Sequence, residues 1–267
     1  MSSKKKQSYK YVYGPVYSWR LGNSLGIDPI GTKQKICNFD CIYCQLGETV
    51  HFENERKIFV PTQDLLREIA HIPSYLQIDS FTFSGRGEPT LAKNLGEMIE
   101  GVKEIKRQKV AVITNSSLMY DPGVRKDLLA ADIVLAKLDA CSQKSFHAVG
   151  RPIKGILLKK VVDGIKEFKA IFQGKLALQI MFVDSNKSLA RQIAQMVREI
   201  GPDEVQLGTP LRPSAVKPLS KEEMDLLKRY FHGLPVVCIY DSETKESFPF
   251  DEAETIKRHG NYKACQN

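Results

Sequence analysis

The 267-residue sequence predicts an α/β fold built around a parallel sheet. Six short apolar runs alternate with longer segments in which apolar residues recur at helical spacing. This alternation is typical of parallel strands joined by right-handed helical crossovers. The runs VAVIT, DIVLAKL and LALQIMFV are apolar almost throughout, which indicates strands buried on both faces. We therefore expect a buried parallel sheet covered by helices.

The expected elements follow one another in a regular order. A first short strand covers residues 24–29, and a loop at residues 31–47 follows it. The other five strands are expected at residues 80–84, 110–114, 132–138, 176–183 and 204–207. The intervening helices, each with an apolar face, are expected at residues 62–71, 91–106, 124–131, 157–172 and 189–200.

The pattern changes after residue 215. A helix is expected at residues 221–231, a strand at 236–240 and a last helix at 251–258. We expect three parts: a basic disordered tail at residues 1–10, the main α/β unit at 11–215, and a C-terminal extension at 216–267 packed on that unit.

The net charge of +8 is unevenly distributed. Half of it comes from the first ten residues, which contain Lys4, Lys5, Lys6 and Lys10. Such a tail is usually solvated and frayed, and it can contact phosphates without reading a sequence. The sequence has no run of 18 apolar residues and no apolar N-terminal segment, so we expect neither membrane spanning nor secretion but a reducing cytoplasm.

Three of the six cysteines lie in one short loop, Cys37-Asn-Phe-Asp-Cys41-Ile-Tyr-Cys44. Iron–sulfur clusters are held by cysteine thiolates, and a four-iron cluster normally takes four of them. The next cysteine is Cys141, so this loop leaves one iron open for a ligand that is not protein. Tyr43, just before the last cysteine of the loop, would lie beside that iron.

The other interpretations of the loop are a zinc site and three ordinary buried cysteines. Structural zinc usually takes four ligands grouped in pairs. The sequence contains no second pair, so we favour the iron–sulfur interpretation.

The spacing C-x3-C-x2-C, with an aromatic residue before the last cysteine, resembles the signature of the radical S-adenosylmethionine (SAM) enzymes. In that superfamily the methionine part of SAM chelates the open iron of a 4Fe-4S cluster. One electron then cleaves SAM to a 5′-deoxyadenosyl radical, which abstracts hydrogen from a substrate. The resemblance implies an α/β fold of the open partial (β/α)6 barrel type, a reductant such as ferredoxin or flavodoxin, and an anaerobic setting.

The second expected strand ends in Ser-Gly85-Arg-Gly87-Glu88-Pro. Working residues of barrel folds stand at the C-terminal ends of strands, and glycines allow close approach of a ligand. The segment resembles the glycine–glycine–glutamate segment of the superfamily, which binds the amino group of SAM. A plain strand-to-helix turn is the other interpretation.

Polar residues also stand at the ends of the next strands. The resemblance implies that Asn115 lies beside SAM, that Lys137 binds the SAM carboxylate and that Asp139 accepts from the ribose hydroxyls. An ion pair between Lys137 and Asp139 is the structural alternative. Gln179 is a polar residue in an apolar strand, so it faces either the cofactor or a partner within the core.

Further segments resemble one branch of the superfamily, the archaeal and bacterial iron–sulfur oxidoreductases near the tRNA wyosine synthases. These segments are GPVYSWRLGNSLGIDPI, CNFDCIYCQLG, FSGRGEPTL, AKLDA, GRP and QLGTPLRP, between residues 11 and 215. Wyosine synthases carry a second cluster on cysteines upstream of the signature loop, and a lysine proposed to hold pyruvate.

This chain departs from that pattern, because no cysteine precedes Cys37. A second metal centre would need Cys141, Cys238 and Cys265 to converge. We therefore expect the cofactor chemistry of the branch and not its wyosine product.

The substrate is left open by the sequence. An RNA-modifying enzyme is the first expectation, a glycyl-radical-enzyme activase or other protein-modifying enzyme the second, and a non-catalytic electron-transfer protein the third. Arg86, Arg151 and Arg212 lie near expected strand ends, where they would receive a phosphate or carboxylate. The alternative is that they lie at the surface or pair with the SAM carboxylate. Cys141 is a candidate catalytic hydrogen donor or metal ligand, or else a small residue that packs its loop.

Overall fold

The computed structural model describes residues 9–243 and 245–261, and its centre is an eight-stranded sheet. The strands run in the order β1-β2-β5-β6-β7-β8-β9-β10 across the sheet. Their bounds are β1 (Val12–Ser18), β2 (Gly22–Ile27), β5 (Ser80–Phe83), β6 (Lys109–Thr114), β7 (Ile133–Lys137), β8 (Lys175–Met181), β9 (Glu204–Gly208) and β10 (Val236–Cys238). All neighbouring strands pair in parallel except β1 and β2, which are antiparallel.

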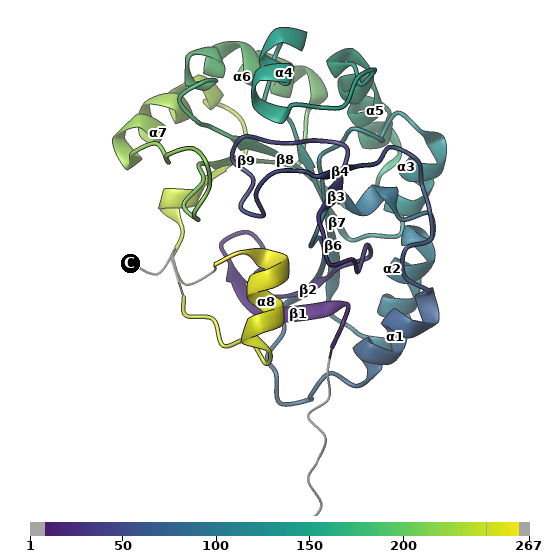
Figure 1. The fold of residues 1–267 in the computed structure, drawn as a ribbon. Coiled ribbons are helices and arrows are strands. Elements are labelled where there is room, and N and C mark those ends of the chain that lie inside the picture. The colour runs from purple at the N-terminus through teal and green to yellow at the C-terminus, as the bar shows by residue number, and fades with distance from the viewer. Residues whose placement is uncertain (1–8, 244, 262–267) are drawn as a thin grey trace, which may run out of the picture.

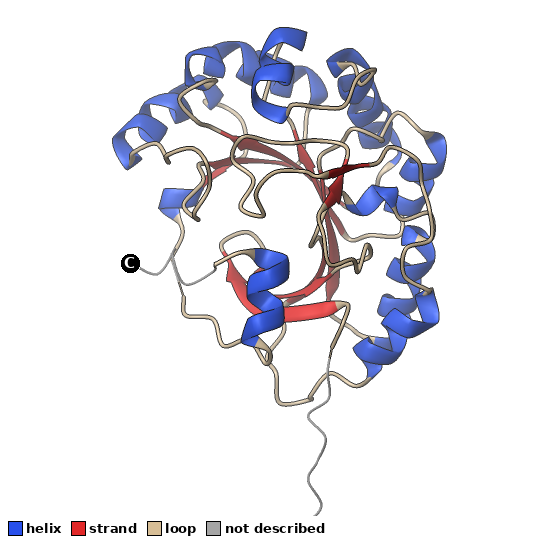
Figure 2. Cartoon of the chain, viewed as in Figure 1, coloured by secondary structure: helices blue, strands red, loops and turns tan. Residues whose placement is uncertain are grey.

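The sheet is strongly curled but does not close, so the fold is an open half-barrel (Figure 1). The helices are α1 (Thr62–Ala70), α2 (Leu95–Ile105), α3 (Pro122–Leu128), α4 (Gln143–Gly150), α5 (Leu158–Ile171), α6 (Ala190–Ile200), α7 (Lys221–Lys228) and α8 (Glu252–His259). Figure 2 shows the strands inside and most helices on the outer side of the curl. The expected α/β partial barrel is confirmed.

The six expected strands are β2 and β5–β9, with ends that differ by a few residues. Several elements were not expected, among them β1, α4 and the two-residue strands β3 (Ile36–Cys37) and β4 (His51–Phe52). Strand β1 was missed because Gly14 and Pro15 interrupt its apolar pattern, and α4 was missed because it has only eight residues. The helix expected at residues 221–231 ends as α7 at Lys228 and continues as a 3-10 turn. The helix expected at residues 91–106 begins only at Leu95, as α2, and a separate 3-10 turn at Pro89–Leu91 precedes it.

The two faces of the central strands have different neighbours, as alternation along a strand requires. Large residues such as Val112 and Leu178 face outward and join the core beneath the helices. On the inner face, Leu21, Ala111, Leu135 and Ala177 form a separate small cluster. The next inward position after Leu135 along β7 is Lys137, and the next after Ala177 along β8 is Gln179. The apolar cluster therefore fills the barrel interior near the N-terminal ends of these strands. Lys137 and Gln179 follow it toward their C-terminal ends.

The C-terminal segment joins both edges of the sheet. Strand β10 pairs with β9, while α8 lies beside β1 (Figure 1). The backbone N–H of Gly14 donates to Thr255 Oγ1 at 2.9 Å, and Arg86 Nε donates to the carbonyl of Lys257 at 2.9 Å. Residues far apart in the sequence thus meet at the open side of the barrel.

The expected tail at residues 1–10 lies outside the described residues except for its last two. Tyr9 is only 5% exposed and donates to the carbonyl of His71 at 2.9 Å, so it is part of the fold. Cys265 lies outside the described residues. Within the described ranges no helix is both long enough and apolar enough to cross a membrane.

Candidate active site

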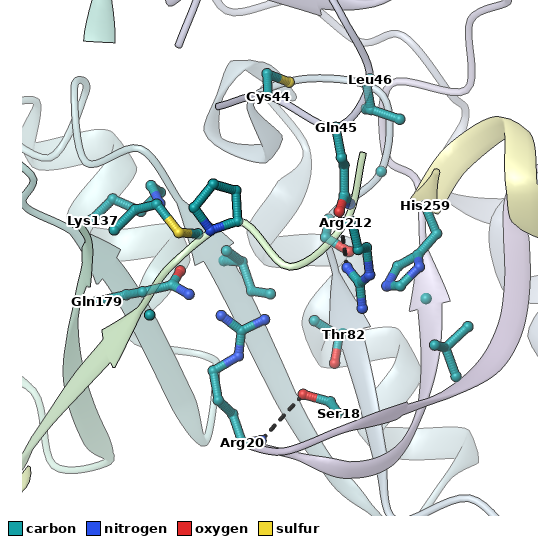
Figure 3. A pocket seen from close by; sticks show the side chains of 18 of the residues that line it. Ser18, Arg20, Cys44, Gln45, Leu46, Thr82, Lys137, Gln179, Arg212 and His259 are labelled. Carbon is teal, nitrogen blue, oxygen red and sulfur yellow. Dashed lines mark hydrogen bonds between the residues drawn. The ribbon is translucent and has the colours of Figure 1, made fainter. Parts of the chain in front are cut away.

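A cavity of about 360 Å³ occupies the inside of the half-barrel. Cys37, Cys41 and Cys44 line it together with Lys137 and Gln179 (Figure 3 shows several of these side chains). Tyr43, Gly85, Gly87, Glu88 and Asn115 line the same cavity. The structure therefore brings together all the site residues expected from the sequence except Asp139 and Cys141.

The glycine–glutamate segment holds the start of the cysteine loop, residues 37–44. The backbone N–H of Ile36 donates to the Arg86 carbonyl at 2.9 Å, and that of Glu88 donates to the Ile36 carbonyl at 3.2 Å. A Cβ atom on Gly87 would lie 1.7 Å from that same Ile36 carbonyl oxygen. Gly87 is therefore required for the close approach of two backbones, besides lining the cavity.

The other side of the cysteine loop is held by the end of α4. The backbone N–H of Ile42 donates to the Val149 carbonyl at 3.0 Å, and that of Asp40 donates to the Gly150 carbonyl at 3.1 Å. The Phe39 ring packs edge-on against Phe146 with centroids 5.3 Å apart. Contacts within the protein therefore fix the cysteine loop on both sides.

The Cys37 and Cys41 thiols lie in a poorly solvated environment. Burial raises the pKa of the Cys37 thiol well above its ordinary range, and the nearby Glu88 carboxylate adds to this effect. Burial also raises the pKa of Cys41 to about 12, although the Lys137 ammonium acts in the opposite direction. Within the described ranges, no three His, Cys, Asp or Glu side chains are arranged to hold a single metal ion.

Glu88 is 2% exposed and is held by several donors. Its carboxylate accepts from Thr90 Oγ1 and from Thr114 Oγ1, each at 2.6 Å, and from the Asn115 backbone N–H at 2.7 Å. Burial raises the pKa of Glu88, while these hydrogen bonds lower it. The Asn115 side chain donates to Asn38 Oδ1 at 2.7 Å. Glu88 therefore organises the loop as well as lining the cavity.

Lys137 lies between an acidic partner and an aromatic ring. Its Nζ atom is 3.7 Å from the Asp139 carboxylate and 4.6 Å from the centroid of the Tyr43 ring. Tyr43 donates its phenol hydrogen to Asp139, which also accepts the Met181 backbone N–H at 2.7 Å. Asp139 lines only a small adjacent cavity of about 20 Å³. Its carboxylate is thus engaged within the protein, while Lys137 also borders the main cavity.

The hydrogen-bonding state of the Gln179 amide indicates whether the cavity suits a polar ligand. Its side chain is 4% exposed and, among the described residues, its amide makes no hydrogen bond. Figure 3 shows this amide directed into the cavity. An amide that lines the cavity and makes no hydrogen bond within the described protein is available to a polar ligand there. The three thiols and this amide together suit a cluster with an organic cofactor beside it.

Cys141 lines neither cavity. It is half-buried against the main hydrophobic core, and its backbone N–H donates to Ser145 Oγ at 3.3 Å. Its catalytic role remains a prediction. Cys238 is buried in β10. The structure also separates the three arginines, since Arg86 binds the end of α8 and Arg151 is 57% exposed beside Asp40.

Arg212 does line the cavity, and with it further basic residues that the sequence did not indicate, among them Arg20 and His259. Arg20 comes from the turn between β1 and β2, and His259 is the last residue of α8. His259 belongs to no recognisable motif, whereas Arg20 lies in the segment GPVYSWRLGNSLGIDPI, whose resemblance gave it no role. Both reach the cavity through elements at the open edge of the sheet.

The fold and the thiol-lined cavity define a class of protein. The sequence model described as "Radical SAM superfamily" matches residues 32–197, and the chain belongs to this superfamily. It is therefore an iron–sulfur enzyme, and its cofactors are a 4Fe-4S cluster and SAM.

Within the superfamily the chain is similar to proteins named UPF0026. One from Synechocystis sp. is 44% identical over 80% of this chain and 80% of its own length. Another from Methanocaldococcus jannaschii is 34% identical over 81% of this chain and 68% of its own length. These values place the chain in the UPF0026 family.

More distant similarities extend to proteins with other names. A probable GTP 3′,8-cyclase from Saccharolobus islandicus is 27% identical over 81% of this chain and 67% of its own length. The structure of TYW1 with a lysine–pyruvate adduct bound is similar to this one, with a TM-score of 0.61 and 13% sequence identity. The similarity covers 81% of this chain and 75% of that chain. The second likeness concerns the fold alone.

Proposed function

We propose that Cys37, Cys41 and Cys44 hold three irons of the 4Fe-4S cluster and that SAM binds beside them in the same cavity. The observation that carries this proposal is the shared lining of one cavity by the three cysteines, Lys137 and Gln179. When bound, the cluster and SAM supply one-electron cleavage of SAM and hydrogen abstraction from a substrate.

The roles of the protein side chains follow from their contacts. Glu88 and Asn115 fix the cysteine loop, and Glu88 offers a carboxylate to the ammonium group of SAM. Lys137 offers a positive charge to the SAM carboxylate, held in place by Asp139 and the Tyr43 ring. The unpartnered Gln179 amide offers hydrogen bonds to a polar part of the ligand. Gly85 and Gly87 line the cavity, and a Cβ on either would meet the neighbouring Asp28 or Ile36.

For the substrate, we propose an RNA as the first candidate, on the basis of the segments that resemble the branch near the tRNA wyosine synthases. The cavity is near the lower end of the 300–1,000 Å³ range for small-molecule sites. An RNA would therefore have to present a single nucleotide, as enzymes that modify bases commonly require. A protein substrate would likewise have to present one side chain or an extended segment.

Anaerobic reconstitution tests the proposed cysteine ligands. The wild-type protein should bind about four irons per chain and release 5′-deoxyadenosine from SAM when reduced. Cys41→Ala should abolish SAM cleavage and lower the iron content. Cys238→Ala is the matched control, since Cys238 lies in β10 and does not line the cavity. Full SAM cleavage by Cys41→Ala would contradict the proposal.

A further inference from the structure

The cavity also has a basic end, formed by Arg20, Arg212 and His259. Arg20 rises from the β1–β2 turn, Arg212 comes from the loop after β9, and His259 ends α8. Figure 3 shows the three side chains turned toward the same region of the cavity. Three separate elements therefore deliver basic groups to one place inside the barrel.

Two of these groups have buried polar atoms that lack hydrogen bonds. Arg20 Nε and His259 Nδ1 are buried and have no hydrogen-bond partner. The Arg20 guanidinium lies 5.2 Å from the centroid of the Trp19 ring, a contact that leaves its N–H groups available. Arg212 Nη1 donates to Gln45 Oε1 at 2.9 Å, which positions this side chain between the cysteine loop and Arg20.

Burial and positive neighbours make the surroundings of Arg20 and His259 unfavourable for a positive charge. Burial and the nearby Arg212 charge lower the pKa of Arg20 to about 10. Burial, Arg212 and Arg20 together lower the pKa of His259 well below its ordinary range. Among the described residues, no carboxylate forms an ion pair with Arg20 or His259.

A neighbouring arginine, which also lines the cavity, has its charge compensated by the protein itself. Arg258 lies next to His259, and its guanidinium pairs with the carboxylates of Asp28 and Glu254. Among the described residues, the acidic ones that line the cavity are Glu88 and Glu243. Glu88 is engaged by Thr90, Thr114 and Asn115, and Glu243 is exposed. The contrast with Arg258 indicates that the compensating charge for Arg20 comes from outside the described chain.

We propose that this basic end binds the carboxylate or phosphate of the substrate, with Arg20 and His259 as its donors and Arg212 beside them. The inference rests on the proposed function, because it takes the cysteine end of the cavity as the site of SAM. A substrate anchored at Arg20 would extend toward Lys137 and Gln179, where the cofactor binds. Arginine suits this task because its planar guanidinium matches both carboxylate and phosphate oxygens.

The test measures anion binding by the full-length reconstituted protein. Inorganic phosphate and acetate are the two probes, and each replaces chloride so that the ionic strength stays constant. Ligands that bind only the folded state raise the midpoint of thermal unfolding in a concentration-dependent way. The wild-type midpoint should rise and saturate with at least one probe. The probe that binds more tightly identifies the carboxylate or phosphate class.

Arg20→Gln should need at least a tenfold higher anion concentration for the same rise in midpoint, while Arg20→Lys should recover part of the response. His259→Gln should weaken the response independently. Arg67→Gln is the matched control, since Arg67 is 72% exposed on α1, and it should respond as the wild type does. In chloride alone Arg20→Gln should unfold at the same or a higher temperature than the wild type, because it removes an uncompensated buried charge.

SAM titrations separate the two possible sources of the anion. If the basic end serves the substrate, SAM affinity in Arg20→Gln stays within threefold of wild type, and phosphate or acetate still binds when SAM is present. A tenfold loss of SAM affinity would overturn the proposal, because the anion would then be the SAM carboxylate. Unchanged anion binding in Arg20→Gln, or a marked loss of its stability in chloride, would also overturn it. The anion titrations can be repeated without SAM. They therefore test the basic end even if the protein does not cleave SAM and the proposed function fails.

Discussion

Glu88 accepts the backbone N–H of Asn115 at 2.7 Å, and this hydrogen bond joins the ends of β5 and β6. The side chain of the same Asn115 lies with its Nδ2 atom 3.8 Å from Cys37 Sγ. A single buried carboxylate thus connects two strand ends to the first cysteine of the loop. Substitutions at Glu88 should therefore affect the scaffold as well as the cofactor.

Glu88→Gln should lower the free energy of unfolding of the cluster-free protein by about 1–3 kcal/mol. The glutamine amide would place a donor against Thr90, Thr114 or Asn115, which are themselves donors to this side chain. Urea unfolding measures the change. Glu100→Gln on the exposed side of α2 is the control, and equal stability of both variants would show that the hydrogen bonds of Glu88 do not support the fold.

Lys137→Met should weaken SAM binding roughly ten- to a hundredfold, because it removes a charge-assisted hydrogen bond at a site shielded from water. Equilibrium binding of SAM to the reconstituted protein measures this. Lys159→Met, on the exposed side of α5, should leave the affinity unchanged. Unchanged SAM affinity together with lower stability in Lys137→Met would mean that Lys137 serves only as the ion-pair partner of Asp139.

Tyr43→Phe should keep the ring under Lys137 and remove the hydrogen bond to Asp139. Leaving a buried carboxylate with one donor fewer costs about 1–3 kcal/mol, so we expect a less stable protein with the same iron content. Tyr75→Phe, at a side chain that is largely exposed, supplies the comparison. If Tyr43→Phe is as stable as Tyr75→Phe, the tie between the cysteine loop and β7 contributes nothing to stability.

His259 should make the stability of the protein depend on pH. Its pKa is lowered in the folded protein by burial, Arg212 and Arg20, and its ring centroid lies 6.1 Å from that of Tyr13. The unfolded chain therefore binds a proton that the folded protein does not, starting near the ordinary histidine pKa of about 6.5. Stability conferred by the neutral ring is lost as pH falls below this value, by up to about 1.4 kcal/mol per pH unit.

His259→Gln should remove that contribution. Unfolding free energies measured between pH 7 and pH 5 in chloride should fall less steeply for the variant than for the wild type. His51→Gln, on the exposed strand β4 (His51–Phe52), should keep the wild-type slope. Parallel curves for His259→Gln and the wild type would show that folding does not lower the pKa of His259.

The local part of the site was predictable from the sequence because short-range spacing determines it. Three cysteines within eight residues must lie on one loop, and the alternation of a strand places Lys137 and Asp139 on the same face. The strand ends also follow from apolar runs, which is why Glu88, Asn115 and Gln179 could be named in advance.

The rest depends on tertiary contacts that no local pattern contains. Asp139 is engaged by Tyr43 and by the Met181 backbone, two segments far from it in the sequence. Arg20 and His259 meet because β1 and α8 lie side by side at the open edge, although 239 positions separate them. Gly87 was expected to admit a ligand, and the structure adds the Ile36 carbonyl as a second reason for glycine there.

The most direct test of the central claim is the low-temperature electron paramagnetic resonance spectrum of the reduced, reconstituted protein before and after addition of SAM. A reduced 4Fe-4S cluster is paramagnetic, and three cysteine ligands leave one iron open to SAM. We predict a cluster signal whose shape changes when SAM is added, in the wild type and in Cys238→Ala. A cluster signal that is unaffected by saturating SAM, or that persists unchanged in Cys41→Ala, would contradict the assignment of Cys37, Cys41 and Cys44.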